Sequence, residues 1–359
     1  MNSSKKSQHE VLFLSEIDWD YLWQRHQIFT TKYAQLGHKV TYVNRPGMRL
    51  PKLSDIPYII KRIFAKASHV ESNAMIKIVS PIFIPGNGIF AKLLNKYIFI
   101  PKLLKNVKDK TKLILHVYQP TELTFEVINQ CPEASVVYDC VQNFEQHPAK
   151  TPNTVKLENE LIRMSKVFIT DSDFLLNKHL EIREAIRVSP GVDFEHFSQT
   201  YRGDEHLVQK KALYYGNVRN DLNFSLINEL VDKFGINVEI VGTIQEEVKK
   251  LIDPRVIVKD KVSYEELPII IKRSDFLLLP YKVNEFTKAI IPAKFTECLA
   301  SGKPIIASRL PAFVEHSESL YFFDTLNQDN IRNHTPNKQQ SIAKGESWQS
   351  KFNMFYDKI

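Results

Sequence analysis

One stretch of the sequence, residues 284–311, combines side chains suited to a sugar with a backbone suited to a phosphate. It reads NEFTKAIIPAKFTECLASGKPIIASRLP and predicts a loop, a helix and a short buried strand. Pro292 suits the first helical position, and Gly302 suits the left-handed position just past the helix end. A helix N-terminus offers unpaired N–H groups that bind phosphate. Because the carboxylates of Glu285 and Glu297 can bind sugar hydroxyls, the stretch predicts a nucleotide-sugar site.

The lysines and Glu297 in this stretch could each also be residues without a role in a site. Lys288 and Lys294 are candidate phosphate contacts, or solvated lysines at about even odds. Glu297 could be a surface glutamate, but it lies just over a turn from the helix start, which favours the site. Cys298 is expected in the core.

Short apolar runs alternate with helical patterns along two parts of the chain, as in parallel α/β sheets. Strands are expected at residues 11–15, 40–43, 75–80, 112–117, 135–139, 166–170 and 185–189, and after the polar linker 198–210 at 212–215, 237–241, 256–258, 276–280 and 304–307. The loop after the first strand lacks Gly-x-Gly-x-x-Gly, which argues against a dinucleotide site there. The last twelve residues predict an amphipathic helix with Trp348, Phe352 and Phe355 on one side. We therefore predict two Rossmann-like domains with a cleft between them.

Polar or glycine residues follow several of these strands. In open α/β sheets ligands bind beyond the carboxyl ends of the strands. Tyr118, Asp139, Gly216, Gly242 and Asn284 all occupy such ends, so we expect them at a site, although each could be an ordinary loop residue. 

The segment after the first strand has the chemistry of an acceptor site. Trp23 offers an aromatic face for a sugar ring, although packing is an equal alternative, and Arg25 with His26 suits an anion. His38 and His116 are expected to be structural.

Composition limits the class of protein. The 359 residues suggest about two domains, and three cysteines without metal spacing fit a reducing cytoplasm. No apolar run reaches the ~20 residues of a membrane span, and the first ten residues lack a signal peptide's apolar segment. Metal binding is not expected.

The net charge of +7 is unevenly distributed. Residues 92–112 contain seven lysines and one acid among long aliphatic residues. The basic amphipathic region 58–112 could bind a membrane surface or nucleic acid. We favour an anionic membrane surface, because no nucleic-acid motif is present.

The chain resembles the GT-B fold retaining glycosyltransferases, family 4-like, in the bacterial branch of teichuronic acid, exopolysaccharide and capsule transferases. The motifs that carry the resemblance are WQRHQ at 23–27, LGHKVTYV at 36–43, VYDC at 137–140, PGVD at 190–193, YEELP at 264–268 with SD at 274–275, and KFTECLASGKPIIA at 294–307. The resemblance covers nearly the whole chain. It implies an acceptor domain at 1–195, a donor domain at 196–344, and a C-terminal helix, 345–359, that crosses back to the first domain.

The resemblance also implies roles for individual residues. Glu297 would bind both ribose hydroxyls, and Asn284 and Glu285 would lie near the transferred sugar. The remaining donor-binding residues would be Gly216, Arg219, Gly242, Val262, Tyr264, Lys288, Ile290, Ile291 and Lys294. Tyr118, Asp139 and Glu285 would be catalytic, and Trp23, Arg25, His26 and Gln119 would bind the acceptor.

Three departures from the family pattern stand out. Glu285 and Glu297 are twelve positions apart, farther than the family's pair. Only Arg219 follows Gly216, where the family often has an arginine and a lysine. Tyr118 occupies a position where some members have a histidine over the donor sugar.

The predicted function is retaining transfer of a hexose from a nucleotide diphosphate sugar to a bacterial surface glycan or polyprenyl-linked acceptor. The helix N-terminus, Arg219 and lysines would stabilise the leaving group without a metal or other cofactor. The leaving phosphate would take the acceptor proton, so that no dedicated base is required. The protein would be cytoplasmic and peripheral at the inner membrane face. The alternatives are a nucleotide-sugar 2-epimerase of the same fold and a degenerate, non-catalytic glycan-binding member.

Overall fold

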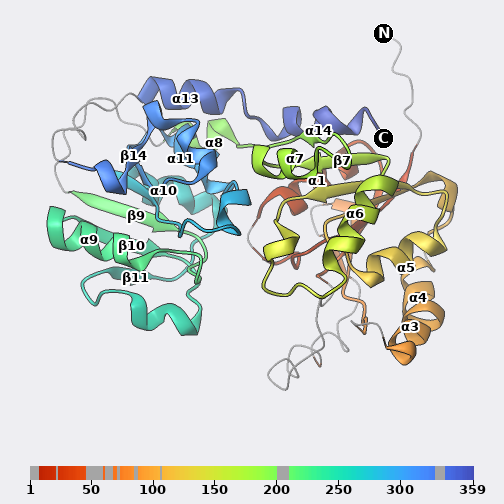
Figure 1. Ribbon diagram of the computed structural model, residues 1–359. Helices are drawn as coiled ribbons and strands as arrows, with labels where there is room; N and C mark the ends of the chain where they lie inside the picture. The colour runs from red at the N-terminus through yellow and green to blue at the C-terminus, as the bar shows by residue number, and fades with distance from the viewer. Residues whose placement is uncertain are drawn as a thin grey trace, which may run out of the picture. The chain divides into compact units, whose positions relative to one another are not determined.

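The computed structural model describes residues 8–21, 23–45, 60, 68–70, 73–84, 88–105, 107–199, 210–327 and 336–359. Its contacts divide the chain into a first unit, Met1–Val188 with Phe352–Ile359, and a second unit, Ser189–Lys351 (Figure 1). The predicted domain boundaries, after 195 and before 345, lie near these limits and stay a proposal. Most of the predicted basic segment 58–66 and linker 198–210 lies outside the described residues.

The described part of the first unit contains an eight-stranded sheet in the order β3-β4-β2-β1-β5-β6-β7-β8. Only β3 runs antiparallel to its neighbour, β4. The central strand β1 pairs with β2 on one side and β5 on the other, so the order of the strands reverses beside β1. The strands are β1 (Glu10–Leu14), β2 (Lys39–Val43), β3 (Ser68–Val70), β4 (Asn73–Val79), β5 (Leu113–Val117), β6 (Ser135–Cys140), β7 (Val167–Thr170) and β8 (Ile186–Arg187).

Helices connect these strands, as expected for a parallel α/β sheet. Side-chain caps begin two of them: the Thr121 hydroxyl accepts from the Thr124 N–H, and the Ser172 hydroxyl accepts from the Leu175 N–H. The α-helices are α1 (Arg25–Gln35), α3 (Ile89–Leu94), α4 (Ile100–Leu104), α5 (Glu122–Gln130), α6 (Thr154–Met164) and α7 (Asp173–His179), with a π-helical turn η2 (Asn95–Phe99) and 3-10 turns η3 (Lys110–Lys112) and η4 (Phe144–Gln146).

The C-terminal helix α14 (Trp348–Tyr356) returns to the first unit. Phe352 and Phe355 are fully buried, and their rings lie 4.9 Å from Tyr33 and 5.2 Å from Phe29 respectively. The His38 Nε2 and the Tyr356 hydroxyl form a 2.6 Å hydrogen bond. The predicted return of this helix to the first domain is confirmed.

The described part of the second unit contains a six-stranded parallel sheet in the order β11-β10-β9-β12-β13-β14. Here the order reverses between β9 and β12. The strands are β9 (Lys211–Tyr215), β10 (Asn237–Val241), β11 (Ile257–Lys259), β12 (Phe276–Leu279), β13 (Ile305–Ala307) and β14 (Tyr321–Phe322). The two Rossmann-like sheets confirm the predicted fold class, while a cleft between the domains stays a prediction.

The helices of the second unit pack around this sheet (Figure 1). The amphipathic α9 ends at Gly235 in the left-handed conformation that a helix C-terminus favours. The α-helices are α8 (Phe194–Ser198), α9 (Phe224–Phe234), α10 (Leu267–Lys272), α11 (Lys294–Ser301), α12 (Pro311–Val314) and α13 (Pro336–Lys344), and the 3-10 turns are η5 (Glu246–Leu251), η6 (Tyr264–Glu266), η7 (Thr287–Ala289), η8 (Ser317–Ser319) and η9 (Phe323–Thr325).

The boundaries of α11 confirm one prediction and correct another. Gly302 has φ of 68° and ends the helix in the left-handed region, as predicted. The predicted start at Pro292 is wrong, because the helix begins at Lys294 after Ala293. The Pro292 carbonyl instead accepts a hydrogen bond from the Phe295 N–H at 2.8 Å, so Pro292 belongs to the preceding turn.

Candidate functional site

Two glycines bring the loops after β9 and β10 into contact at the edge where a ligand would bind. A Cβ on Gly242 would lie 1.9 Å from the Gly216 carbonyl oxygen, so no other residue fits there without moving the loop. Gly216 has φ of +115°, which side-chain-bearing residues rarely adopt. The site therefore begins with bare backbone at the point where the strand order reverses.

Lys294, the first residue of α11, extends beneath this loop. Its Nζ donates to the Tyr214 hydroxyl at 2.8 Å and lies 4.1 Å from the centre of the Tyr214 ring. A Cβ on Gly216 would come within 2.8 Å of the same nitrogen. Burial lowers the pKa of Lys294 to about 8. The structure thus places a desolvated cation against the glycine loop, where it could contact a phosphate.

Glu297 lies one turn further along α11 and is partly buried. Its Oε2 accepts a 3.0 Å hydrogen bond from the Tyr215 hydroxyl, next to Gly216. Burial raises the pKa of Glu297, and Tyr215, Lys294 and His196 partly oppose that shift. A carboxylate held in this way is suited to accept hydrogen bonds from two neighbouring hydroxyls.

An aromatic pair stands beside Glu297. The rings of His196 and Tyr264 are stacked with centroids 4.5 Å apart, and His196 Nε2 is 3.0 Å from the Tyr264 carbonyl oxygen. Val262, two residues earlier, packs on the domain core. This pair offers a planar apolar surface near the predicted base-binding segment.

The loop before α11 is held by its own polar groups. The Asn284 Oδ1 accepts from the N–H groups of Phe286 and Thr287 at 3.0 and 2.9 Å. The Ile290 N–H donates to the Thr287 carbonyl at 3.1 Å. In this structure the Ile290 amide predicted to hold the diphosphate is therefore engaged within the loop, and Asn284 shapes the turn.

Three predicted contacts, Glu285, Lys288 and Arg219, lie in two ion pairs. Glu285 Oε1 accepts from Lys288 Nζ at 2.7 Å, one turn apart on the surface. Arg219 Nη2 lies 2.9 Å from an Asp221 carboxylate oxygen. The pair of Glu285 and Lys288 has both side chains exposed, and surface pairs of this kind are weak, so Lys288 could exchange its partner for a ligand at little cost.

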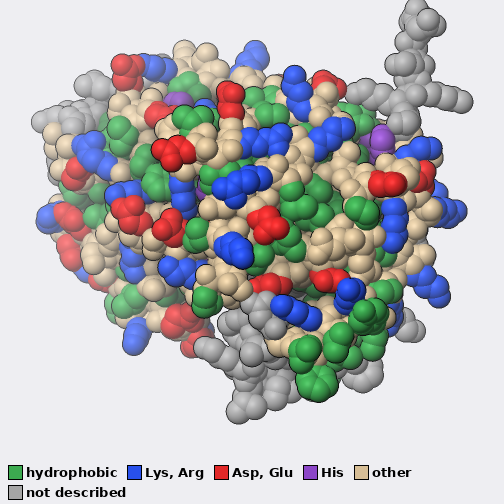
Figure 2. Space-filling model, turned by 45° about the vertical axis from the view of Figure 1, so that its right-hand side comes forward, with side chains coloured by type: hydrophobic (Ala, Val, Ile, Leu, Met, Phe, Trp, Pro, Cys, Tyr) green, Lys and Arg blue, Asp and Glu red, His purple; other side chains and the backbone are tan. Residues whose placement is uncertain are grey.

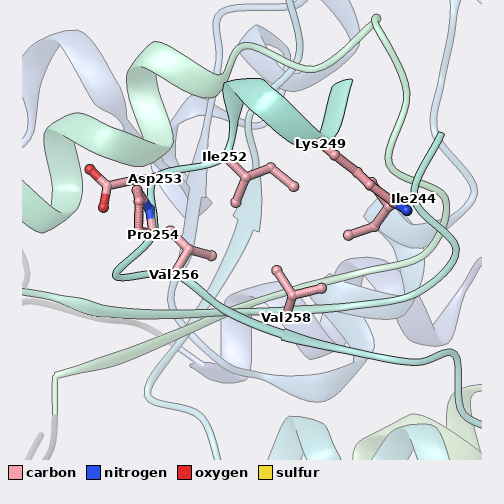
Figure 3. Close-up of a pocket in the computed structure, with 7 residues that line it drawn as sticks. All are labelled: Ile244, Lys249, Ile252, Asp253, Pro254, Val256 and Val258. Atoms are coloured by element: carbon pink, nitrogen blue, oxygen red, sulfur yellow. The ribbon is translucent and has the colours of Figure 1, made fainter. Parts of the chain in front are cut away.

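A shallow pocket of about 290 Å³ lies on another part of the second unit, beside η5 and β11 (Figure 3). Apolar side chains of Ile252, Val256 and Val258 converge on it, with Lys249 at its rim (Figure 3). None of the predicted site residues lines this pocket.

In the first unit, Asp139 and Arg25 form a buried ion pair. Arg25 donates to the two Asp139 oxygens at 2.7 and 2.9 Å and to the Val188 carbonyl, while His116 Nε2 lies 3.4 Å from Asp139. Burial alone would raise the pKa of Asp139, but Arg25 and His116 hold it well below its usual range. In this structure the two side chains bind each other inside the domain, and a catalytic role for Asp139 and an anion-binding role for Arg25 stay predictions.

The other predicted residues of the first unit lie near the end of β1. Tyr118 is fully buried with its ring 4.0 Å from that of His26, whose Nε2 lies 3.6 Å from Glu16 Oε1. Gln119 is also buried, so Tyr118, His26 and Gln119 are interior residues here. Trp23 is 45% exposed and remains available to a sugar ring.

Sequence reasoning missed four side chains at these sites. Tyr214 and Tyr215 end β9, His196 stacks on Tyr264, and Glu16 follows β1 beside His26. Tyr215 and Glu16 lie at the carboxyl ends of predicted strands, and this position could have identified them as candidate site residues. No local pattern indicated His196, whose partner is 68 residues away.

Residues 210–333 match the family model of glycosyl transferases group 1. A curated relative, TuaH of Bacillus subtilis (strain 168), named as a teichuronic acid biosynthesis glycosyltransferase, is 26% identical over 173 residues. That match spans 43% of this chain and 43% of the relative. The match to the family therefore lies in the second unit, around the site described above.

Solved structures match over the whole chain. Anabaena Alr3699/HepE in complex with UDP-glucose has a TM-score of 0.65 at 12% identity, covering 96% of this chain and 97% of that one. TarM of S. aureus has a TM-score of 0.59 at 10% identity, covering 98% and 100%. At this identity the likeness concerns the fold.

The two parallel sheets and these matches define the class of protein as GT-B. Within that class, residues 210–333 are similar to the group 1 glycosyl transferases and 173 residues are similar to TuaH, which confirms the resemblance to that family. No helix among the described residues has the length and apolar character needed to cross a bilayer.

Proposed function

We propose that the protein is a retaining glycosyltransferase that moves a hexose from a nucleotide diphosphate sugar to a bacterial surface glycan or lipid-linked acceptor. The observation that carries the proposal is the cluster of Glu297, Tyr215 and Lys294 beside the Gly216 loop. It combines an acceptor for ribose hydroxyls, a cation and bare backbone at the sheet's switch point. HepE, which is similar in fold, was crystallised with UDP-glucose.

In the proposed complex each group has a distinct task. Glu297 accepts hydrogen bonds from the ribose, oriented by the Tyr215 hydroxyl. Lys294, the glycine-loop backbone and the N-terminus of α11 stabilise the diphosphate, on which negative charge accumulates as the anomeric bond breaks. Arg219 and Lys288 supply further positive charge from their surface pairs. The leaving phosphate accepts the acceptor's proton, and Trp23 contacts the acceptor sugar.

Incubation with a panel of UDP-, GDP- and dTDP-sugars tests this function. We expect slow release of nucleoside diphosphate from one donor, strongly reduced by Glu297→Gln and retained by the surface variant Glu246→Gln, whose side chain is exposed on the second unit. Nuclear magnetic resonance of a transferred product should show the anomeric configuration of the donor. An epimerised donor without diphosphate release would instead indicate a 2-epimerase, and binding of none of the donors would indicate a non-catalytic member.

We also propose that the first unit binds the cytoplasmic face of an anionic membrane. Helix α3 and the π-helical turn η2 expose Ile89, Phe90 and Tyr97 at 70%, 79% and 65%, among the exposed lysines Lys92 and Lys96. Figure 2 shows hydrophobic side chains gathered at the lower edge of this face. Apolar side chains ringed by lysines suit the boundary between headgroups and acyl chains.

Liposome sedimentation tests the membrane proposal. Binding should need anionic lipid, weaken with salt, and fall in the double variant Ile89→Ser/Phe90→Ser. Ile257→Ser, which changes an exposed apolar residue of the second unit, is the control. Binding that does not change with lipid charge, or that Ile89→Ser/Phe90→Ser and Ile257→Ser reduce equally, would refute the membrane proposal.

A further inference from the structure

Three buried side chains with metal-binding atoms meet inside the first unit, whereas the proposed donor residues belong to the second unit. Cys140 ends β6, Glu158 lies on α6 and His179 ends α7, with exposures of 0%, 1% and 2%. The Glu158 Oε1 lies 3.5 Å from Cys140 Sγ and 3.6 Å from His179 Nε2. All three ligand atoms fall within 4.8 Å of one another.

Hydrogen bonding accounts for only part of this cluster. Glu158 accepts from the Tyr138 hydroxyl at 3.1 Å and from the Cys140 thiol, so the carboxylate is satisfied. The buried His179 Nε2 has no hydrogen-bond partner among the described residues. An unpaired ring nitrogen in the interior is costly unless something else binds it.

We propose that Cys140, Glu158 and His179 bind a zinc ion. Thiolate, imidazole and carboxylate are the ligands that zinc prefers, and tetrahedral bonds of about 2.0 to 2.3 Å place such ligand atoms roughly 3.3 to 3.6 Å apart. The observed separations at Glu158 match this spacing. A thiolate and a carboxylate also balance the charge of a divalent cation.

Binding requires loss of one proton. The Cys140 thiol releases its proton to solvent as the sulfur–zinc bond forms, while His179 binds as the neutral ring and Glu158 as the carboxylate. The Tyr138 hydroxyl is a candidate for the fourth position. The neighbouring Lys178 amine opposes a cation, but it is paired with Glu145 at 3.2 Å.

The ion would be structural. It would tie α6 and α7 to the end of β6, where the adjacent Asp139 holds Arg25. No short metal-binding spacing indicates the site in the sequence, because Cys140 and Glu158 are 18 positions apart. This proposal differs from the expectation that the cysteines have no part in metal binding, and it is independent of the proposed metal-free transfer in the second unit.

Metal analysis and cobalt substitution of the purified full chain test the site. We expect one zinc per chain and, after exchange, a near-ultraviolet absorption from thiolate-to-cobalt charge transfer. Cys140→Ser should abolish the absorption, whereas Cys131→Ser, which removes another buried free thiol, should preserve it. Chelation should lower the Tm of the unsubstituted protein.

The unsubstituted protein alone can overturn the proposal, so the test does not depend on the folding of Cys140→Ser. Absence of stoichiometric zinc together with absence of the charge-transfer absorption would refute the site. Equal loss of absorption in the Cys131→Ser protein, with both variants folded by circular dichroism, would also refute it.

Discussion

At the scale of single residues, Glu297 and Lys294 depend on the same desolvated surroundings. Burial raises the pKa of the carboxyl and lowers the pKa of the amine, so both charged forms are less stable than in water. A nucleotide diphosphate would stabilise both charged forms, because its ribose hydroxyls would bind the Glu297 carboxylate and its phosphates would bind the Lys294 ammonium group. Partial burial is therefore expected to strengthen each contact once the donor is bound.

The first prediction concerns the pH dependence of donor binding. The protonated Lys294 binds phosphate, and its pKa in the free protein is about 8, below the ordinary 10.5. Affinity for the nucleoside diphosphate should be full below pH 8 and fall as pH rises above it, by up to about tenfold per pH unit. Calorimetric titration between pH 6.5 and 9.5 measures this. Lys294→Met should bind more weakly at pH 7 and lose the pH dependence, whereas Lys288→Met should keep it; the reverse pattern would contradict the assignment.

The second prediction concerns the buried pair in the first unit. Asp139→Asn leaves the Arg25 charge without its partner, which should cost about 3 to 5 kcal/mol of unfolding free energy. The exposed pair of Arg309 and Asp324 is the control, and Asp324→Asn should cost no more than about 1 kcal/mol. Denaturant unfolding compares them. Because the pKa of Asp139 is depressed, the ion pair should stabilise the folded protein above pH 3.8, the ordinary pKa of the carboxyl, and this stabilisation should be lost as the pH falls below it. Equal losses of unfolding free energy in Asp139→Asn and Asp324→Asn would contradict this account.

The sequence allowed several candidate site residues to be predicted, but it did not show which side chains surround them in the folded protein. Gly216, Gly242 and Glu297 were predicted because strand ends and helix starts constrain where a ligand can bind, and their part in a donor site stays a prediction. Asp139 was predicted at a strand end correctly, but its partner Arg25 is 114 positions away. Only the packed structure brings that guanidinium to the carboxylate and turns an expected site residue into an interior one.

At the scale of elements, the loops after β9 and β10 act as one unit. They approach closely because neither Gly216 nor Gly242 carries a side chain, and the Gly216 N–H donates to the Val241 carbonyl at 2.9 Å. The position of the Gly216 loop relative to α11 therefore depends on Gly242 in the loop after β10.

The third prediction tests that dependence. Gly242→Ala would drive its methyl group into the Gly216 carbonyl, so we expect about 1 to 3 kcal/mol of destabilisation and weaker donor binding. Gly345→Ala, where the new methyl would meet only an ordinary 3.7 Å contact, is the control. Thermal unfolding and donor titration measure both effects. Unchanged affinity in a folded Gly242→Ala protein would show that the loop contact does not shape the site.

The fourth prediction concerns α14. Phe355 is fully buried against Phe29 and His116, so Phe355→Ala should cost about 3 to 5 kcal/mol in the first unit. Met354, its neighbour on the same helix, is 43% exposed, and Met354→Ala should change stability by less than about 0.5 kcal/mol. Equal effects in chemical denaturation would mean that the helix does not pack as described.

Elements were predicted more reliably than their ends. Apolar runs and helical periodicity located the main strands and helices, because burial of one face imposes the pattern. The start of α11 was misplaced by two residues since Pro292 suits both a first helical turn and the preceding bend. The π-helical turn η2 had no distinct signal, because it differs from an α-helix only in its hydrogen-bond register.

At the scale of the whole molecule, each unit has a sheet whose strand order reverses once, but the two units have different functional residues. The second unit gathers the proposed donor residues at its switch point, and the family match lies within it. The first unit has the proposed acceptor contact, the exposed apolar helices and the proposed zinc site. Such a division suits a transferase with one donor and a variable acceptor, because each substrate can be recognised by a separate domain.

The central claim is that Glu297 binds the ribose of a nucleotide donor, and a double-mutant cycle on the nucleotide tests it most directly. Binding of UDP and 2′-deoxy-UDP, and of GDP and 2′-deoxy-GDP, would be measured by calorimetry with the unsubstituted protein, Glu297→Gln and the control Glu285→Gln. For the preferred base, we predict a coupling of about 1 to 3 kcal/mol between Glu297 and the 2′-hydroxyl, and none with Glu285. Equal weakening of the ribose and deoxyribose ligands by Glu297→Gln, or no weakening of either, would contradict the account.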